Sequence, residues 1–367
     1  MKERKYHFET PVEPERWCEP DFHTDHAFSF AVVGDPQRIS LGDMYQGTNK
    51  MDQIFGMIAD SAKERKLEHV FVVGDMTHTT YRNDGNLAAR HNDPPVVTEW
   101  EIAKKAILQL NEAKIPYTIC RGNHDDYMID DYFNAPFYTD QFKGCGGFFS
   151  DSDAKHPKCR EKKNPEGYIY WSAVRGHYED SINNSYRTAD ICGNKYLFVT
   201  VDYNPTENVV KWVDKILGEF PDRLAIVMTH SYLSGKGNLR TSEEGDTMYP
   251  LGFTADKLWE MALQNHKNLL MVICGHIFAT TPVYSTKIGI HGNVVHQFLV
   301  DPQSYDTGKA EDGTISGGVQ DTGLVLYINF SEDGKKITFD YYSTLLDKNW
   351  AELPAEEIFL FDKNPLE

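Results

Sequence analysis

The chain has 367 residues, of which 37 are Lys or Arg and 55 are Asp or Glu, so its formal net charge is −18. This acidic balance argues against an extended nucleic acid or an anionic membrane surface as a partner, because both are bound through basic patches. No segment approaches the ~20 apolar residues of a membrane span, and the N-terminus lacks the apolar core of a signal peptide. We therefore expect a soluble protein with no membrane span, cytoplasmic unless a secretion signal has been removed.

The chain contains six cysteines, which are too sparse for a disulfide scaffold. Cys120 and Cys274 end apolar runs, which predicts buried thiols. Cys145, Cys159 and Cys192 lie in a loop-rich region and could pair in an oxidising compartment. The sequence leaves that pairing and the oligomeric state open.

Strand and helix patterns alternate along the chain as far as Thr281, which indicates β-α-β units. The stretch FSFAVVGD is a strand pattern that ends in Gly-Asp at Asp35, and HVFVVGD repeats the pattern and its ending at Asp75. The segment between them places its apolar residues on one helical face: Met51, Ile54, Phe55, Ile58 and Ala62. No linker divides the chain, so we expect a single large α/β domain over residues 1–367.

Further helices are expected at three places. Thr98 and Glu101 have the spacing of a capping box, which predicts a helix start there, ahead of the strand pattern IPYTIC. Apolar spacing predicts a helix around Val209 to Leu217 and another from Thr254 to His266. The strand patterns KYLFVTVD, LAIVMTH and LLMVICGH lie before, between and after these last two helices.

Two regions depart from this alternation. Residues 126–191 are poor in periodicity and rich in Gly, Asn, Asp and Tyr, so we expect a long loop-rich insertion, a common place for binding elements. Residues from about 282 to 350 are β-rich, and Asp333-Gly334 predicts a turn between two strands.

Five apolar runs end in side chains that can bind metal ions: Asp35 with Gln37, Asp75, Asn123 with His124, His230, and His276. In open α/β sheets ligands bind beyond the carboxyl ends of the strands, so these side chains can converge. A single Gly-Asp or a single strand-end histidine is more often a turn or a structural hydrogen-bonding group. The order and spacing of the whole set favour one metal site built from all of them.

The segments GDPQ, GDMTH, GNHD, MTHS and CGH resemble the motifs of the calcineurin-like metallophosphoesterase family, which are D-x-H, G-D-x-x, G-N-H-D/E, a later His and G-H-x-H. The resemblance covers Phe28 to Gln303, and GNHD is its most specific part. It implies a four-layer α/β/β/α sandwich of two mixed β-sheets flanked by helices. It also implies two divalent metal ions, drawn from Mn, Fe, Zn or Mg, at the strand ends.

Family roles carried over by position make Asp75 the bridging ligand, with Asn123, His230 and His276 completing the shell of one metal. All four residues are present.

The second metal position departs from the family. The resemblance maps its ligands to Asp35, Gln37, Asp75 and Phe278, so Gln and Phe stand where the family has two histidines. An amide oxygen can bind a cation, whereas a phenyl ring cannot. We expect one tightly held ion beside a second position that is weak or vacant, rich in oxygen, and selective for Mn²⁺ or Mg²⁺ over Zn²⁺.

The resemblance implies a metal-dependent phosphoester hydrolase, either a phosphomonoesterase or a phosphodiesterase, that uses a metal-bound hydroxide. His124 would donate a proton to the leaving group or stabilise the transition state. Asp125 would orient His124, or alternatively cap a following helix.

The substrate is expected to be a small phosphorylated molecule such as a nucleotide or a sugar phosphate. Arg82, Asn83 and Tyr81 are candidate substrate contacts, because an arginine can pair with a phosphate through two hydrogen bonds. His78 and His91 are weaker candidates for additional metal ligands.

Two other functions fit the same residues. A mononuclear metal site that polarises a carbonyl would hydrolyse an amide or ester, a reading favoured by the impaired second position. A member of the fold could also bind metal and ligand without turnover. His124 argues weakly against this last function, because a binding site needs no proton donor beside the metal.

Overall fold

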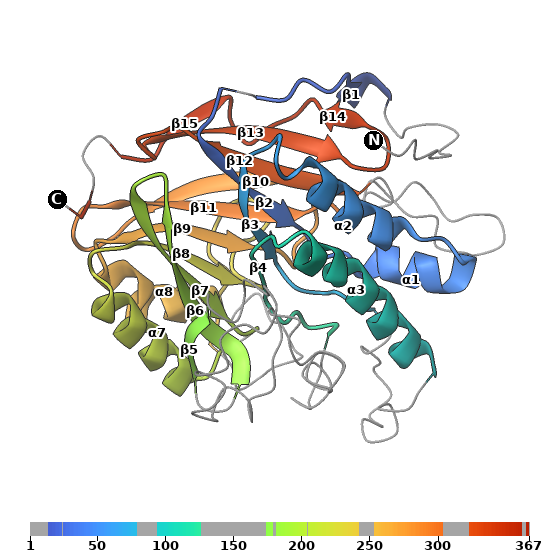
Figure 1. The fold of residues 1–367 in the computed structure, drawn as a ribbon. Helices are drawn as coiled ribbons and strands as arrows, with labels where there is room; N and C mark the ends of the chain where they lie inside the picture. The colour runs from blue at the N-terminus through green and yellow to red at the C-terminus, as the bar shows by residue number, and fades with distance from the viewer. Residues whose placement is uncertain are drawn as a thin grey trace.

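The computed structural model of the chain describes residues 14–23, 25–78, 94–125, 174–178, 181–203, 205–241, 253–303, 323–361 and 365–366. Two mixed β-sheets lie face to face at the centre of the molecule, and helices cover the outer face of each sheet (Figure 1). This is the four-layer α/β/β/α sandwich that the sequence predicts.

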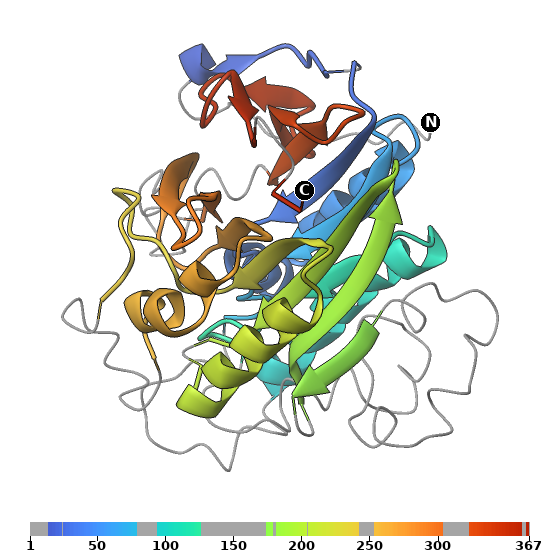
Figure 2. The same ribbon diagram turned by 90° about the vertical axis from the view of Figure 1, so that its left-hand side faces the viewer.

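The first sheet combines strands from both ends of the chain. Its order is β1 (Trp17–Cys18), β14 (Lys348–Trp350), β13 (Lys336–Ser343), β12 (Leu324–Phe330), β2 (Phe28–Val33), β3 (Leu67–Val72) and β4 (Tyr117–Ile119), with β15 (Glu357–Phe359) paired to β13. Strands β2, β3 and β4 run parallel, so their carboxyl ends meet at one edge. Figure 2 shows the N-terminal segment (blue) lying against the C-terminal strands (red), where β1 pairs with β14.

The second sheet is built from the middle of the chain. Its order is β10 (Ala279–Ile288), β11 (Val294–Asp301), β9 (Leu269–Cys274), β8 (Leu224–Thr229), β7 (Asn194–Val201), β6 (Ser181–Ile191) and β5 (Val174–Tyr178). Strands β7, β8, β9 and β11 are parallel to one another. Their carboxyl ends therefore also lie at one edge.

The central strands are buried on both faces, which explains their continuous apolar sequences. Along β2, Phe28, Phe30 and Val32 pack between the two sheets, whereas Ala31 and Val33 pack under the helices of the first sheet. From Met271 to Cys274, strand β9 alternates in the same way between the inter-sheet core and the core beneath the helices of the second sheet. Three stacked apolar layers thus hold the strand ends in place.

Two sets of helices complete the layers. Helices α1 (Gln37–Gln46), α2 (Lys50–Ser61) and α3 (Pro94–Glu112) cover the first sheet. Helices α7 (Glu207–Glu219) and α8 (Ala255–Met261), with the 3₁₀ turns Leu263–Asn265 (η4) and Pro14–Arg16 (η1), account for the other described helical segments. Among the helices that the structure describes, none combines the length and apolar character that a membrane span requires.

Most helix expectations are confirmed. The predicted face of α2 is buried at Met51, Ile54, Phe55 and Ile58, and α7 buries its predicted apolar face. The helix predicted from Thr254 to His266 is α8 followed by the 3₁₀ turn. The predicted Asp333-Gly334 turn joins β12 and β13.

Two expectations are wrong. Helix α3 begins at Pro94, so Thr98 lies inside it and is not an N-cap; proline is favourable in the first turn because no N–H partner is needed there. The end of the expected loop region forms the antiparallel strands β5 and β6 instead of loops. The rest of that insertion lies outside the described residues, as do Cys145 and Cys159. Cys192 is exposed, while Cys120 and Cys274 are buried as expected.

Candidate metal centre

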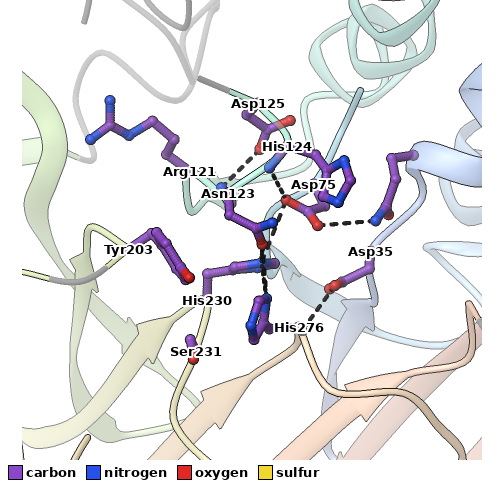
Figure 3. Close-up of polar contacts among 12 residues, drawn as sticks. Asp35, Asp75, Arg121, Asn123, His124, Asp125, Tyr203, His230, Ser231 and His276 are labelled. Atoms are coloured by element: carbon purple, nitrogen blue, oxygen red, sulfur yellow. Dashed lines mark hydrogen bonds and ion pairs between the residues drawn. The ribbon is translucent and has the colours of Figure 1, made fainter. Parts of the chain in front are cut away.

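The candidate metal ligands predicted from the sequence come together where the carboxyl ends of strands from the two sheets meet (Figure 3). Asp35, Asp75 and Asn123 follow β2, β3 and β4 of the first sheet. His230 and His276 follow β8 and β9 of the second. The candidate site therefore lies across the junction of the sheets, with candidate ligands from both.

The backbone at this junction is strained at three of the candidate ligands. Asp35, Asp75 and His276 have φ values of 26°, 52° and 73°, in the left-handed region that residues with a Cβ seldom adopt. Such strain persists only where the surrounding fold enforces it, and it concentrates at functional sites.

Two glycines of the motifs are required by close approach. A Cβ on Gly275 would lie 2.1 Å from Asp35 Oδ1, and a Cβ on Gly122 would lie 2.1 Å from Asp75 Oδ1. The carboxylates of Asp35 and Asp75 thus occupy the space that a side chain at position 275 or 122, respectively, would need. Any larger residue at position 122 or 275 would displace a candidate ligand.

Three potential ligand atoms converge on the side of the second sheet. His230 Nδ1 lies 2.8 Å from the Val73 carbonyl oxygen and donates to it, which leaves the lone pair of Nε2 facing the site. Asn123 Oδ1 lies 2.9 Å from that Nε2 and 2.8 Å from His276 Nδ1, and the two histidine nitrogens are 3.2 Å apart. Lone pairs this close are balanced by a proton or a cation, so the arrangement fits a metal ion.

Asp75 lies between the two halves of the site. Its Oδ1 accepts a hydrogen bond from the His124 backbone N–H at 2.8 Å and lies 3.4 Å from His230 Nε2. Its Oδ2 accepts from Gln37 Nε2 at 3.0 Å. One ligand atom each from Asp35, Asp75 and His230 lie within 4.8 Å of one another, and all three residues are buried.

The side of the first sheet is rich in oxygen and negative charge. Asp35 accepts a hydrogen bond from the His276 N–H at 2.8 Å, yet its pKa is raised well above the usual value by burial and by the charges of Asp301 and Asp75. Gln37 Oε1 is buried and receives no hydrogen bond from the described residues. Crowded carboxylates beside an amide oxygen are a donor set that fits a hard divalent cation.

His124 lies beside the candidate metal ligands, and the ring of a second histidine packs against it. Its ring stacks on that of His78, with ring centres 4.7 Å apart. Burial lowers the pKa of His124 to about 3 and that of His78 to about 4. Both rings are therefore neutral at pH 7.

Asp125 connects two of the loops that carry ligands. Its carboxylate accepts hydrogen bonds from the backbone N–H groups of Met76, Thr77 and Gly122 at 2.6, 3.1 and 2.9 Å. Burial raises its pKa to about 7 while these hydrogen bonds oppose the shift. These contacts fix the backbone around Asp75 and Asn123, a role that the sequence alone does not reveal.

Two further residues at the site were not predicted. Tyr203 packs against both histidines, with ring centres 5.4 Å from His230 and 5.5 Å from His276. Glu99, on α3, accepts hydrogen bonds from the His78 N–H and from Ser40 Oγ. Tyr203 follows the end of β7, so a search for side chains at strand ends could have found it. Glu99 lies within a helix, and its sequence position gives no indication of its role.

The structure brings together eight predicted residues: Asp35, Gln37, Asp75, Asn123, His124, Asp125, His230 and His276. The side chain of Phe278 is 52% exposed. The candidate substrate contacts Tyr81, Arg82 and Asn83, and also His91, lie outside the described residues.

Comparison with known families identifies the class of protein. The calcineurin-like phosphoesterase family matches residues 28–278, which contain every candidate metal ligand named above. The chain belongs to this family, and the match confirms the resemblance predicted from the motifs.

Similarity to individual proteins is more distant. The chain is 25% identical over 303 residues to the uncharacterized protein YvnB of Bacillus subtilis (strain 168); the match covers 80% of this chain but only 18% of YvnB. Among solved structures, a dimetal phosphatase from Danio rerio is 9% identical, with coverage of 92% of this chain and 99% of the other and a TM-score of 0.48. The purple acid phosphatase PPD1 from yellow lupin (Lupinus luteus) seeds is 12% identical, with coverage of 90% and 53% and a TM-score of 0.47.

Proposed function

We propose that this protein is a metal-dependent phosphoester hydrolase that acts on a small phosphorylated substrate. Family membership supports the reaction class. The observation that carries the proposal is the convergence of Asn123 Oδ1, His230 Nε2 and His276 Nδ1 within 2.8 to 3.2 Å of one another, beside the buried carboxylates of Asp75 and Asp35. Burying these polar and charged groups costs free energy, and apolar side chains would stabilise the fold at this place at lower cost. The set is therefore better explained by binding a cation than by a structural role.

Asp75, Asn123, His230 and His276 would hold one divalent cation, and Asp35, Gln37 and Asp75 would hold a second. When bound, such cations polarise phosphoryl oxygens and make a water nucleophilic at neutral pH. The oxygen donors of the second position favour Mn²⁺ or Mg²⁺.

His124 acts on the substrate as a neutral hydrogen-bond donor through Nε2, in the tautomer that gives up the 3.4 Å contact of Nδ1 with the His78 carbonyl oxygen. Because burial lowers its pKa to about 3, the ring carries a single N–H at pH 7 and cannot serve as an imidazolium acid before substrate binds. Stacking on His78 restricts its orientation. We infer that it steadies the charge that develops on the phosphoryl group.

Hydrolysis of p-nitrophenyl phosphate and bis(p-nitrophenyl) phosphate tests the proposal. Protein stripped with a chelator should be inactive and should recover activity when Mn²⁺ is restored. His230→Ala should lose roughly 10²-fold or more in kcat/KM, the scale of one essential polar group. His266→Ala is the matched control, because His266 pairs with Asp214 away from the metal ligands and should retain activity.

Other outcomes would favour the rival functions. Metal-dependent cleavage of p-nitrophenyl acetate without cleavage of either phosphoester would point to the amide or ester hydrolase. Metal binding without any turnover would point to a binding protein. Phosphoester cleavage that survives both chelation and His230→Ala would contradict the proposal.

A further inference from the structure

The tripeptide Asp-Pro-Gln occurs twice in the chain, each time at the carboxyl end of a strand. Asp35-Pro36-Gln37 follows β2 and contributes to the metal centre. Asp301-Pro302-Gln303 is the second copy, and Asp301 is the last residue of β11. The second copy follows the same strand-end rule that located the first.

The fold places the two copies against each other. A Cβ on Gly34 would lie 2.3 Å from the Val300 carbonyl oxygen and 2.9 Å from Pro302 Cδ, so the ends of β2 and β11 are in direct contact. Asp301 is also the β-sheet partner of Ala279, the residue that follows Phe278. Asp301 thus lies beside the position where this chain lacks the family's histidine.

The carboxylate of Asp301 is buried but only half satisfied. The residue has 0% exposure, and Oδ1 accepts a hydrogen bond from the Gln303 N–H at 3.0 Å. Its Oδ2 is buried and receives no hydrogen bond from the part of the chain that the structure describes. A buried anionic oxygen without a donor is costly, and a cation is the partner that would compensate it best. Gln37 Oε1 is in the same condition on the facing copy.

We propose that Asp301 compensates for the missing histidine by supporting the second metal position through Asp35. The inference rests on the proposed metal-dependent function. Asp301 stands outside the trio of groups whose atoms lie within 4.8 Å of one another. Its carboxylate contacts that of Asp35, so it acts through Asp35 or through a water in the cation's shell. The direct ligands of the second position are then the oxygens of Asp35, Gln37 and Asp75, and Asp301 adds a carboxylate beside Asp35, which suits Mn²⁺ or Mg²⁺.

Metal titration tests this assignment without relying on activity. The full chain, stripped with a chelator, would be titrated with Mn²⁺ by calorimetry, and bound metal would be counted by elemental analysis. Wild-type protein should bind two ions with different affinities. Asp301→Asn should weaken the second ion roughly 10- to 100-fold and leave the first unchanged, as for other carboxylates that support a metal ion. The variant retains the acceptor for the Gln303 N–H.

Two controls separate a metal role from a structural one. Phe278→Ala should leave both affinities unchanged, because the phenyl ring supplies no ligand. Asp340→Asn removes another buried carboxylate, which is hydrogen-bonded to Asn329 on the first sheet, and should also leave both affinities unchanged. The double variant Asp301→Asn with Phe278→His should recover part of the second affinity.

The metal-free proteins give a second, independent measurement. Asp301→Asn should raise the thermal midpoint of stripped protein, because it removes one of the crowded negative charges at the site. A lowered midpoint with unchanged affinity for the second ion would assign Asp301 a purely structural role and overturn the proposal. Absence of any bound ion in wild-type protein would instead contradict the proposed function itself.

Discussion

The two halves of the candidate metal centre offer a cation different kinds of ligand atom. Asn123, His230 and His276 present neutral ligands that are held 2.8 to 3.2 Å apart by the protein, and His230 is fixed in its tautomer by a backbone carbonyl. Asp35 and Asp301 are buried carboxyl groups; burial raises the pKa of both, and the charge of Asp301 raises the pKa of Asp35 further. The first half is organised without an ion, whereas the second half needs one to become favourable.

This difference predicts how the two ions behave. A preorganised set of neutral ligands loses little on binding, so its ion should be held tightly and exchange slowly. A set of crowded carboxylates binds through charge neutralisation and competes with protons, so its ion should exchange readily. Activity should therefore follow occupancy of the half that contains Asp35.

The largest expected effect comes from the residue that both halves share. Asp75→Ala removes the carboxylate between them, and both ions should weaken together. We expect a loss of at least roughly 10³-fold in kcat/KM, above the 10²- to 10³-fold typical of a single oxyanion donor. Steady-state kinetics with saturating Mn²⁺ and elemental analysis of the same sample would check it. Retention of the first ion would show that Asp75 belongs to one half only.

Asp35→Ala should separate the halves. The second ion should be lost while the first remains, because the side-chain contacts among Asn123, His230 and His276 stay in place although His276 loses the hydrogen bond from its N–H to Asp35. Activity should fall roughly 10²-fold and should not recover with added Mn²⁺. Asp43→Asn is a suitable control, since Asp43 caps the start of α2 rather than facing the metal ligands. Full activity with one ion would favour a mononuclear mechanism.

His124→Ala should cost roughly 10²-fold, and the dependence on the leaving group distinguishes its two candidate roles. A neutral donor that stabilises the phosphoryl group should give similar losses for good and poor leaving groups, because their protonation is not involved. Kinetics with a series of substituted phenyl phosphates would measure this. Losses that grow with poorer leaving groups would restore the proton-donor role.

The strand-end ligands were predictable because one rule governs them all. Parallel strands buried on both faces are continuous apolar runs, and the first polar residues after them must lie at one edge. Asp35, Asp75, Asn123, His230 and His276 satisfy this rule. The alternation of strands and helices predicted the α/β class, whereas the four-layer sandwich was implied by the resemblance to the family.

Other features depend on pairings that the order of the chain does not show. The importance of Asp301 arises because β11 lies beside β9 and its end meets β2, although these strands are far apart in sequence. The helix start predicted at Thr98 is wrong because the helix already begins at Pro94. Both residues are typical of helix starts, and the local sequence does not show which of them is used. Strands β5 and β6 were missed because their polar sequences form one end of the second sheet and lack an apolar run.

The charge difference between the halves should also make the stability of the metal-free protein depend on pH. Burial raises the pKa of Asp301 from 3.8 to about 6, so the folded state holds this proton more tightly than the unfolded state. Stability of the wild type should therefore fall as pH rises through this window, whereas Asp301→Asn lacks the group. The advantage of the variant should be absent near pH 4 and complete above pH 6, reaching at most about 100-fold in the unfolding equilibrium constant. Denaturant unfolding of both stripped proteins would measure it; a constant difference would contradict the assignment.

Phe278→His should have the smallest effect and would sharpen the distinction between the halves most directly. The side chain of Phe278 is 52% exposed, so a histidine fits there without disturbing the core. If Asp301 already supports the second position, the new imidazole adds one ligand to a set that binds the ion without it. The second ion should then tighten by only about 10-fold, near the lower limit for a supporting residue. In the Asp301→Asn background the same histidine should tighten binding of the second ion considerably more, because the support from Asp301 is then missing and the imidazole replaces it. Calorimetric titration of the wild type, both single variants and the double variant gives the coupling, and simple additivity would mean that Asp301 and position 278 act on different parts of the site.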